Sequence, residues 1–164
     1  GGVGRMGRWF CAEGEAGEGV VPGILTRAKG VGRGGPVGAC LVNDSVSGHI
    51  KENDLGTTFG GGMLAMAAVV ATLEAIENDD MIANARKVEQ HLRDSLAGLS
   101  GVRGIHGKGC LLGIEFDEPC GPIHQKLLDK NIITGTSSDP NVLRLLPPMM
   151  VGLDQIDMFV EALK

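Results

Sequence analysis

Glycine is distributed unevenly along this chain of 164 residues, and this distribution limits what its first third can fold into. Residues 1–62 hold 18 of the 27 glycines, whereas the longer stretch 63–164 holds 9. Glycine loses more conformational freedom on folding than any other residue and weakens helices and strands. We therefore expect the first stretch to contain mainly loops and short strands.

The longest apolar run begins directly after this glycine-rich stretch. Residues 63–76 are apolar on nearly every face and rich in good helix formers, so we expect a buried helix. The sequence Asn-Asp-Asp at residues 78–80 ends this helix and can cap the next one, an amphipathic helix that should end near Gly101. Upstream, short apolar runs at residues 24–25 and 37–42 predict two buried strands, which are too few to make a domain.

The segment after Gly101 predicts a small α+β domain. Its expected elements are β-like runs at residues 110–116 and 142–146, a helical pattern at residues 123–130 and a last helix at residues 154–163. With the preceding helix they give the order α-β-α-β-α. The changes in glycine content and charge place a boundary near residue 77.

Charge and composition exclude several classes of function. The net charge of −5 belongs to residues 63–164, which carry nine basic and fourteen acidic groups. An acidic chain with 3% aromatic residues and no basic run lacks the features of a nucleic-acid binder. The longest uninterrupted apolar run has about half the length of a membrane span, and no secretory signal pattern is visible.

The four cysteines and four histidines do not follow a metal-binding pattern. The cysteines lack C-x-x-C spacing, and the histidines are scattered along the chain. We expect no metal site, and reduced structural thiols in a cytoplasmic protein.

Two glycine motifs resemble nucleotide-binding loops. Residues 2–7 match G-x-G-x-x-G, but a strand must lead into that motif and a helix must follow it, and the sequence predicts neither. Residues 104–109 lack the first glycine and the Ser or Thr of a Walker loop, so we expect a β-turn there.

The loop at residues 56–62 is a stronger candidate for anion binding. Thr57 and Thr58 precede three glycines and the predicted helix, so hydroxyls and backbone amides gather at a positive helix end. Such a loop can hold a phosphate without a basic residue. The alternative is a flexible hinge with a threonine cap.

Lys29 is the fourth candidate, because it lies between an apolar run and a loop made mostly of glycine. A lysine that is desolvated on one side can have its amine freed near neutral pH for Schiff-base chemistry. The alternative is a solvated loop lysine.

Five segments resemble, in order and spacing, class III (ornithine-type) aminotransferases, which depend on pyridoxal 5′-phosphate (PLP). They are GVGRMGRWF at residues 2–10, VPGILTRAKG at residues 21–30, PVGA at residues 36–39, GTTFGG at residues 56–61 and LRLLPP at residues 143–148. The resemblance covers essentially the whole chain. It implies the α/β fold type I of PLP-dependent transferases, with residues 1–77 as the C-terminal part of the large PLP-binding domain and residues 78–164 as the small α+β domain.

The resemblance also implies roles for four residues. Lys29 would carry PLP as a Schiff base and move the proton between substrate and cofactor. Thr58 would bind the cofactor phosphate across a subunit interface, and Thr57 would touch the amino substrate. Arg144 would grip the α-carboxylate of 2-oxoglutarate, since a guanidinium fork suits a carboxylate. Its alternation with apolar neighbours fits a strand, although an exposed arginine at a sheet edge would show the same pattern.

The implied reaction transfers the terminal amino group of N-acetylornithine, or of a similar ω-amino substrate, to 2-oxoglutarate in arginine biosynthesis, catalysed by a homodimer with a shared active site. Ornithine and 4-aminobutyrate transaminases share the same lysine and threonine motifs. A non-catalytic stand-alone domain is the alternative from another class.

Several parts of the family's active site have no counterpart in this sequence. They are the acidic partner of the pyridine nitrogen, the upstream phosphate loop, the stacking aromatic residue and the arginine for the acetylated substrate. We therefore expect a C-terminal fragment that does not transaminate at a useful rate alone.

The sequence also departs from the family pattern at a few positions. Gly23 replaces a usual aspartate, Arg33 a usual glycine, and Gly62-Met63 a common Asn-Pro, while residues 14–19 are expected to form a longer surface loop. None of these changes removes a residue with a chemical role, but Arg33 could crowd the lysine loop.

Overall fold

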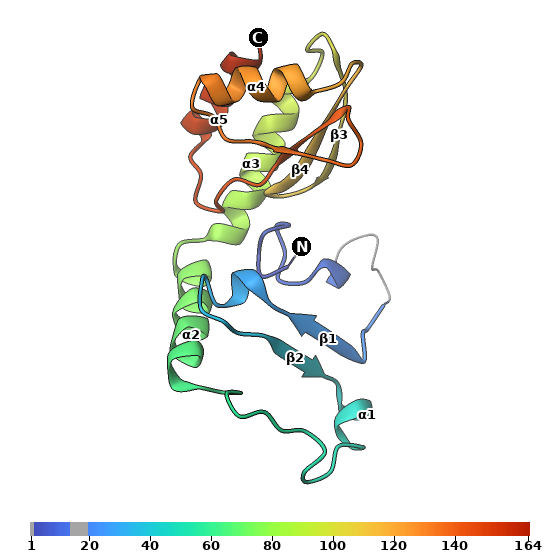
Figure 1. Cartoon of the computed structure of the whole chain (residues 1–164), viewed down its shortest axis with the longest axis vertical. Coiled ribbons are helices and arrows are strands. Elements are labelled where there is room, and N and C mark those ends of the chain that lie inside the picture. Colours follow the sequence, from blue (N-terminus) through green and yellow to red (C-terminus); the bar gives the residue numbers. More distant parts are fainter. Residues whose placement is uncertain (1, 14–19) are drawn as a thin grey trace.

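The computed structural model describes residues 2–13 and 20–164, so the expected surface loop at residues 14–19 lies outside the described residues. Figure 1 shows two lobes stacked along the long axis, with the N-terminal half in the lower lobe and the C-terminal half in the upper one. The helices α2 (Met63–Asn78) and α3 (Met81–Leu96) follow one another along the long axis and connect the two lobes.

The upper lobe is an antiparallel sheet in the order β3-β4-β6-β5, covered on one face by helices. Its strands are β3 (Val102–Lys108), β4 (Leu111–Phe116), β5 (Gly135–Thr136) and β6 (Val142–Leu145). The helices α3, α4 (Gly121–Asp129) and α5 (Leu153–Leu163) contribute to a single core with β4 and β6. This arrangement confirms an α+β fold for the second half of the chain.

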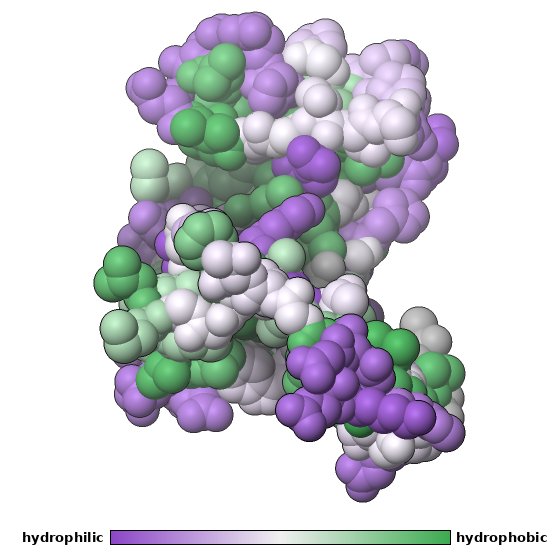
Figure 2. Space-filling view, turned by 60° about the horizontal axis from the view of Figure 1, so that its bottom comes forward, coloured by the Kyte–Doolittle hydropathy of each residue, from purple (hydrophilic) through white to green (hydrophobic). Residues whose placement is uncertain are grey.

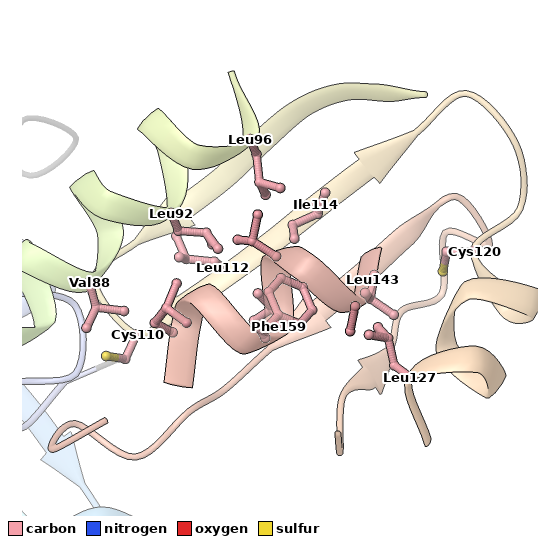
Figure 3. Packing of buried hydrophobic residues seen from close by; sticks show 14 of the residues in the cluster. Val88, Leu92, Leu96, Cys110, Leu112, Ile114, Cys120, Leu127, Leu143 and Phe159 are labelled. Carbon is pink, nitrogen blue, oxygen red and sulfur yellow. The ribbon is translucent and has the colours of Figure 1, made fainter. Parts of the chain in front are cut away.

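Alternation of side chains explains which sheet face the helices cover. Leu112, Ile114 and Phe116 of β4 are buried, and so are Leu143 and Leu145 of β6. Figure 3 shows Leu112, Ile114 and Leu143 meeting the apolar stripe of α3 and the Phe159 ring of α5. Phe116 and Leu145 belong to the same core. Residues of the opposite parity in β4 and β6 lie on the outer face of the sheet.

The sequence missed two strands and misplaced several element boundaries in this lobe. The β-turn expected at residues 104–109 is wrong, because β3 runs to Lys108 and the turn lies at Gly109 and Cys110. Two glycines and an exposed outer face gave β3 a weak apolar pattern. The second helix ends at Leu96 rather than near Gly101, and the Asp80 side chain makes no capping hydrogen bond.

The lower lobe contains a two-stranded antiparallel hairpin beside α2. Its strands are β1 (Ile24–Arg27) and β2 (Ala39–Val42), with short helices η1 (Cys11–Glu13), η3 (Lys29–Val31) and α1 (Asp44–Ser47). The two strands were expected to be buried, but Ile24 is 58% exposed and Leu41 is 46% exposed. The described residues therefore leave this hairpin largely uncovered.

The expectation that residues 63–76 form a buried helix is correct for the helix and wrong for its burial. Only Thr72 and Ile76 of α2 are buried, whereas Met63 and Leu64 are each 90% exposed. A helix that is apolar on every face requires cover on every side. The described residues pack against only part of α2, so most of its apolar surface faces outward.

Residues 2–10 form a turn that is fastened to the upper lobe. The Arg5 guanidinium donates to the carbonyls of Cys110 at 3.0 Å and Pro147 at 2.7 Å. The Arg86 guanidinium donates to the Gly7 carbonyl at 2.7 Å. Gly4 has φ +84, and a Cβ there would meet the Met149 methyl group at 2.6 Å, so a side chain would not fit.

The four cysteines form no disulfide. Cys110 and Cys120 are buried, and burial raises the pKa of both thiols, which favours the unreactive protonated form. Cys11 and Cys40 are exposed, so the expected structural role applies to the other two.

Within residues 2–13 and 20–164, no helix is both long and apolar enough to cross a membrane.

Candidate functional site

Lys29 lies at the sharp turn where the chain leaves β1. It begins η3 with φ +55, a left-handed conformation that costs a residue with a side chain about 1–2 kcal/mol. Val31, two residues later, is buried and anchors the turn, while the Lys29 side chain is exposed. Its position is thus fixed by the backbone rather than by contacts of its amine.

The surroundings of Lys29 are open. A Cβ at Gly30 or Gly34 would meet nothing within 4 Å. Among the described residues, no hydrogen bond or ion pair engages the Lys29 amine. The sequence suggested partial burial of this lysine, but the described residues do not bury it; they leave a free amine beside a face that a flat ligand can approach.

Thr57 and Thr58 lie in the loop before α2, and both side chains are exposed. The helix begins after Gly62, whose amide donates to the Phe59 carbonyl at 3.3 Å. In the part of the chain that the structure describes, neither threonine hydroxyl caps the first turn of α2. The threonine-cap alternative is therefore not observed, and the positive helix end stays open beside two hydroxyls.

Arg144 projects from β6 on the outer face of the sheet. Its neighbours Leu143 and Leu145 are buried in the core, and Arg144 itself is exposed, as alternation in a strand requires. It is paired in register with Gly113 of β4 and Gly135 of β5. Within the described residues no carboxylate pairs with its guanidinium.

A cavity of about 240 Å³ opens beside Arg144 on the outer face. It is lined by His106, Gly107, Leu111, Leu112, Gly113, Ser137, Val142 and Arg144. An unpaired guanidinium at the edge of a cavity can bind a carboxylate through two parallel hydrogen bonds that it donates.

A charged cluster on the same face was not found from the sequence. The Glu115 carboxylate accepts from His106 at 2.7 Å and from Arg103 at 3.0 Å. These hydrogen bonds, with His106 contributing most, lower the pKa of Glu115 below its ordinary value of 4.5. The alternation of β3 and β4 would have placed His106 and Glu115 on one face, had β3 been recognised.

The candidate residues occupy three separate places. The turn that carries Lys29 follows β1 beside α2, the threonine loop lies at the lower end of α2, and Arg144 lies in the upper lobe (Figure 1). No hydrogen bond among the described residues joins Lys29 to Thr57 or Thr58. Within the described ranges 2–13 and 20–164, no group of three or more His, Cys, Asp or Glu side chains could hold a metal ion.

Comparison with known proteins gives consistent matches over the whole chain. The family model described as "Aminotransferase class-III" matches residues 1–164. Acetylornithine aminotransferase of Bacillus subtilis is 41% identical over 99% of this chain and 42% of its own length. Acetylornithine aminotransferase 1 of Bordetella bronchiseptica is 37% identical over 99% of this chain and 41% of its own length.

Solved structures of similar proteins show the same arrangement. The acetylornithine aminotransferase from Elizabethkingia anophelis matches with a TM-score of 0.84 and 26% identity, over 99% of this chain and 42% of that one. The ornithine delta-aminotransferase of Plasmodium falciparum matches with a TM-score of 0.80 and 32% identity, again over 99% and 42%. The chain thus spans about two fifths of the length of its relatives.

Proposed function

Because the chain belongs to the class III aminotransferase family, we propose that its residues form part of the active site of a PLP-dependent aminotransferase. The cofactor of this family is PLP, and the fold of the chain is that of a fold type I fragment. The observation that carries the proposal is the free Lys29 amine at an open, glycine-rich turn within a chain that matches the family from end to end. We assign residues 1–77 to the large domain and residues 78–164 to the small one.

The residues present fit PLP in their chemistry. Lys29 offers an amine without a partner, beside glycines that leave the approach open. The loop before α2 offers the hydroxyl of Thr58 and the uncapped amides of a helix start, which together suit a phosphate dianion. When bound, PLP supplies the electron sink that stabilises negative charge on the substrate carbon.

The roles of the chain's own residues follow from these positions. Lys29 holds the cofactor and moves the proton at the substrate carbon through its Nζ atom. Thr58 binds the cofactor phosphate in the partner subunit of a homodimer, which agrees with the separation of its loop from the Lys29 turn. Thr57 contacts the amino substrate, and Arg144 orients the keto acid through its carboxylate.

The proposed substrates are N-acetylornithine and 2-oxoglutarate. Support comes from the names of the relatives, since three of the similar proteins above are acetylornithine aminotransferases. Ornithine is a second candidate donor, because a similar solved structure is an ornithine delta-aminotransferase. 4-Aminobutyrate is a third, by the shared motifs alone.

Turnover by the protein that the complete gene encodes tests this proposal. Acetylornithine, ornithine and 4-aminobutyrate would each be offered with 2-oxoglutarate, and we expect the highest kcat/KM for acetylornithine. Lys29→Arg should lower kcat at least about 10²-fold, the low end of a general acid–base contribution. Lys51→Arg, which preserves charge at another exposed lysine, should leave it unchanged. No turnover of any donor would support the non-catalytic alternative.

A further inference from the structure

We propose that Gly135 is a positioning residue for Arg144: the absence of a side chain on β5 allows the guanidinium to lie against that strand in the orientation that binds the keto acid. This inference rests on the proposed role of Arg144 as the carboxylate ligand.

The geometry places Arg144 directly over Gly135. The two residues are register partners in the β5–β6 pair. A Cβ at position 135 would lie 3.2 Å from the Arg144 Nε atom and 3.4 Å from its Nη2 atom. The first distance is shorter than an ordinary van der Waals contact between heavy atoms, and the second lies at the lower limit of that range. A side chain at position 135 would therefore press against the guanidinium, which would have to shift by a few tenths of an ångström.

The backbone does not explain this glycine. Gly135 lacks the positive φ that eight other glycines adopt among the residues that the structure describes. It lies in a strand, where glycine weakens pairing relative to other residues. Close approach of the Arg144 side chain is a physical reason for a glycine there.

The opposite neighbour of Arg144 behaves differently. Gly113 is its register partner on β4, but a Cβ there would meet the Val142 Cγ1 atom at 2.9 Å and not Arg144. The guanidinium thus lies toward the edge strand β5. Of the two neighbouring glycines, only Gly135 on β5 therefore lies beside the guanidinium.

Orientation decides how well a guanidinium binds a carboxylate. Two parallel N–H···O bonds form only when the fork lies in the plane of the carboxylate. A methyl group at position 135 forces the fork to move by a few tenths of an ångström, and a larger side chain moves it further. We expect such a change to weaken one charge-assisted hydrogen bond, a loss of about tenfold in affinity.

The test uses Gly135→Ala and Gly135→Val in the protein that the complete gene encodes. Two quantities are measured: the KM values for 2-oxoglutarate and for the amino donor, and the Kd of glutarate, an unreactive dicarboxylate, by calorimetry. We expect the 2-oxoglutarate KM and the glutarate Kd to rise about tenfold in the alanine variant and more in the valine variant. The KM for the amino donor should stay within about twofold.

Gly104→Ala is the matched control, because Gly104 lies on β3 and an added Cβ would meet only the His106 Nε2 atom at an ordinary 3.9 Å. It should change neither quantity. In an Arg144→Ala background, Gly135→Ala should add nothing to the loss, since the two changes act on one interaction.

The outcomes separate the inference from its premise. If Arg144→Ala leaves the 2-oxoglutarate KM and the glutarate Kd unchanged, the proposed role of Arg144 is wrong. If Arg144→Ala raises both but Gly135→Ala has no more effect than Gly104→Ala, the positioning role alone is overturned. Equal loss for both substrates in Gly135→Ala would also overturn it, because it would indicate a general structural defect.

Discussion

Lys29 and Arg33 both adopt left-handed backbone conformations, with φ values of +55 and +45. Residues with side chains avoid this region, and strain of this kind gathers at functional sites. For Lys29, the proposed chemistry requires the side chain and so explains why a lysine occupies a strained position. For Arg33, the guanidinium extends to the Met81 sulfur at 3.8 Å, so its side chain reaches the start of α3.

Glycine at position 33 would relieve this left-handed conformation, and the effect can be measured. Arg33→Gly should be more stable than Arg33→Ala by about 0.5–1 kcal/mol, because glycine relieves the strain but loses more entropy on folding. The two variants lack the same guanidinium, so only the backbone differs. Thermal unfolding measures the stability of both variants. If the alanine variant is the more stable one, the backbone at position 33 is not strained.

The proposed role of the Thr58 hydroxyl can also be tested by substitution. If it binds the cofactor phosphate, Thr58→Val should raise the Kd of the apoenzyme for PLP about tenfold through the loss of one charge-assisted hydrogen bond. Thr58→Ser keeps the hydroxyl and should preserve the affinity. Thr26→Val, at an exposed threonine of β1, is the control. Titration with PLP followed by absorbance measures all three, and equal affinity of the valine and serine variants would remove Thr58 from the phosphate site.

At the scale of elements, the β3–β4 hairpin is joined on its outer face by Glu115 with His106 and Arg103. Because the folded state lowers the pKa of Glu115, the ionised carboxylate stabilises the fold above the ordinary pKa of 4.5. This contribution is lost as the pH falls through the lowered pKa of the folded state.

Glu115→Gln removes that dependence. We expect the Tm of the wild-type protein to fall more steeply than that of Glu115→Gln as the pH is lowered from about 5 through the lowered pKa. Asp129→Asn, which removes an exposed acid on α4, should follow the wild type. Parallel curves for wild type and Glu115→Gln would show that the hairpin gains nothing from this carboxylate.

The sequence predicted elements well where an apolar stripe had one covered face. The amphipathic α3 and α5 and the alternating β4 were found with small errors at their ends. It failed for β3 and β5, whose glycines carry no pattern and whose pairing depends on distant strands. The prediction that α2 is buried was also wrong. The sequence pattern shows which faces of a helix are apolar, but it does not show whether another element covers them.

The site was predictable only in part. The residue types of Lys29, Thr58 and Arg144 could be read from ordered motifs. The open turn around Lys29, the uncapped start of α2 and the closeness of Gly135 to Arg144 depend on backbone geometry that no local pattern gives.

At the scale of the whole molecule, the described chain exposes extensive apolar surface in the N-terminal half. Leu55, Phe59, Met63 and Leu64 are each at least 75% exposed. Figure 2, which brings the bottom of the molecule forward, shows hydrophobic residues at several places on this lobe. Exposed apolar surface of this kind marks an interaction surface or a risk of aggregation.

Residues 1–164 expressed alone should therefore associate and should not transaminate. We expect higher-order species by light scattering and no measurable turnover with PLP, acetylornithine and 2-oxoglutarate. Replacing Met63 and Leu64 by glutamate should reduce the association. Lys87→Glu, at an exposed polar position of α3, is the control and should not reduce it. A monodisperse, active chain would contradict both expectations.

The central claim is that Lys29 carries PLP, and one measurement tests it directly. The protein that the complete gene encodes would be incubated with PLP, reduced with borohydride, digested and mapped by mass spectrometry. The account predicts a reduced pyridoxyl adduct on the peptide that contains Lys29, and none after Lys29→Arg. An unmodified Lys29 peptide under conditions that saturate the protein with PLP would contradict it.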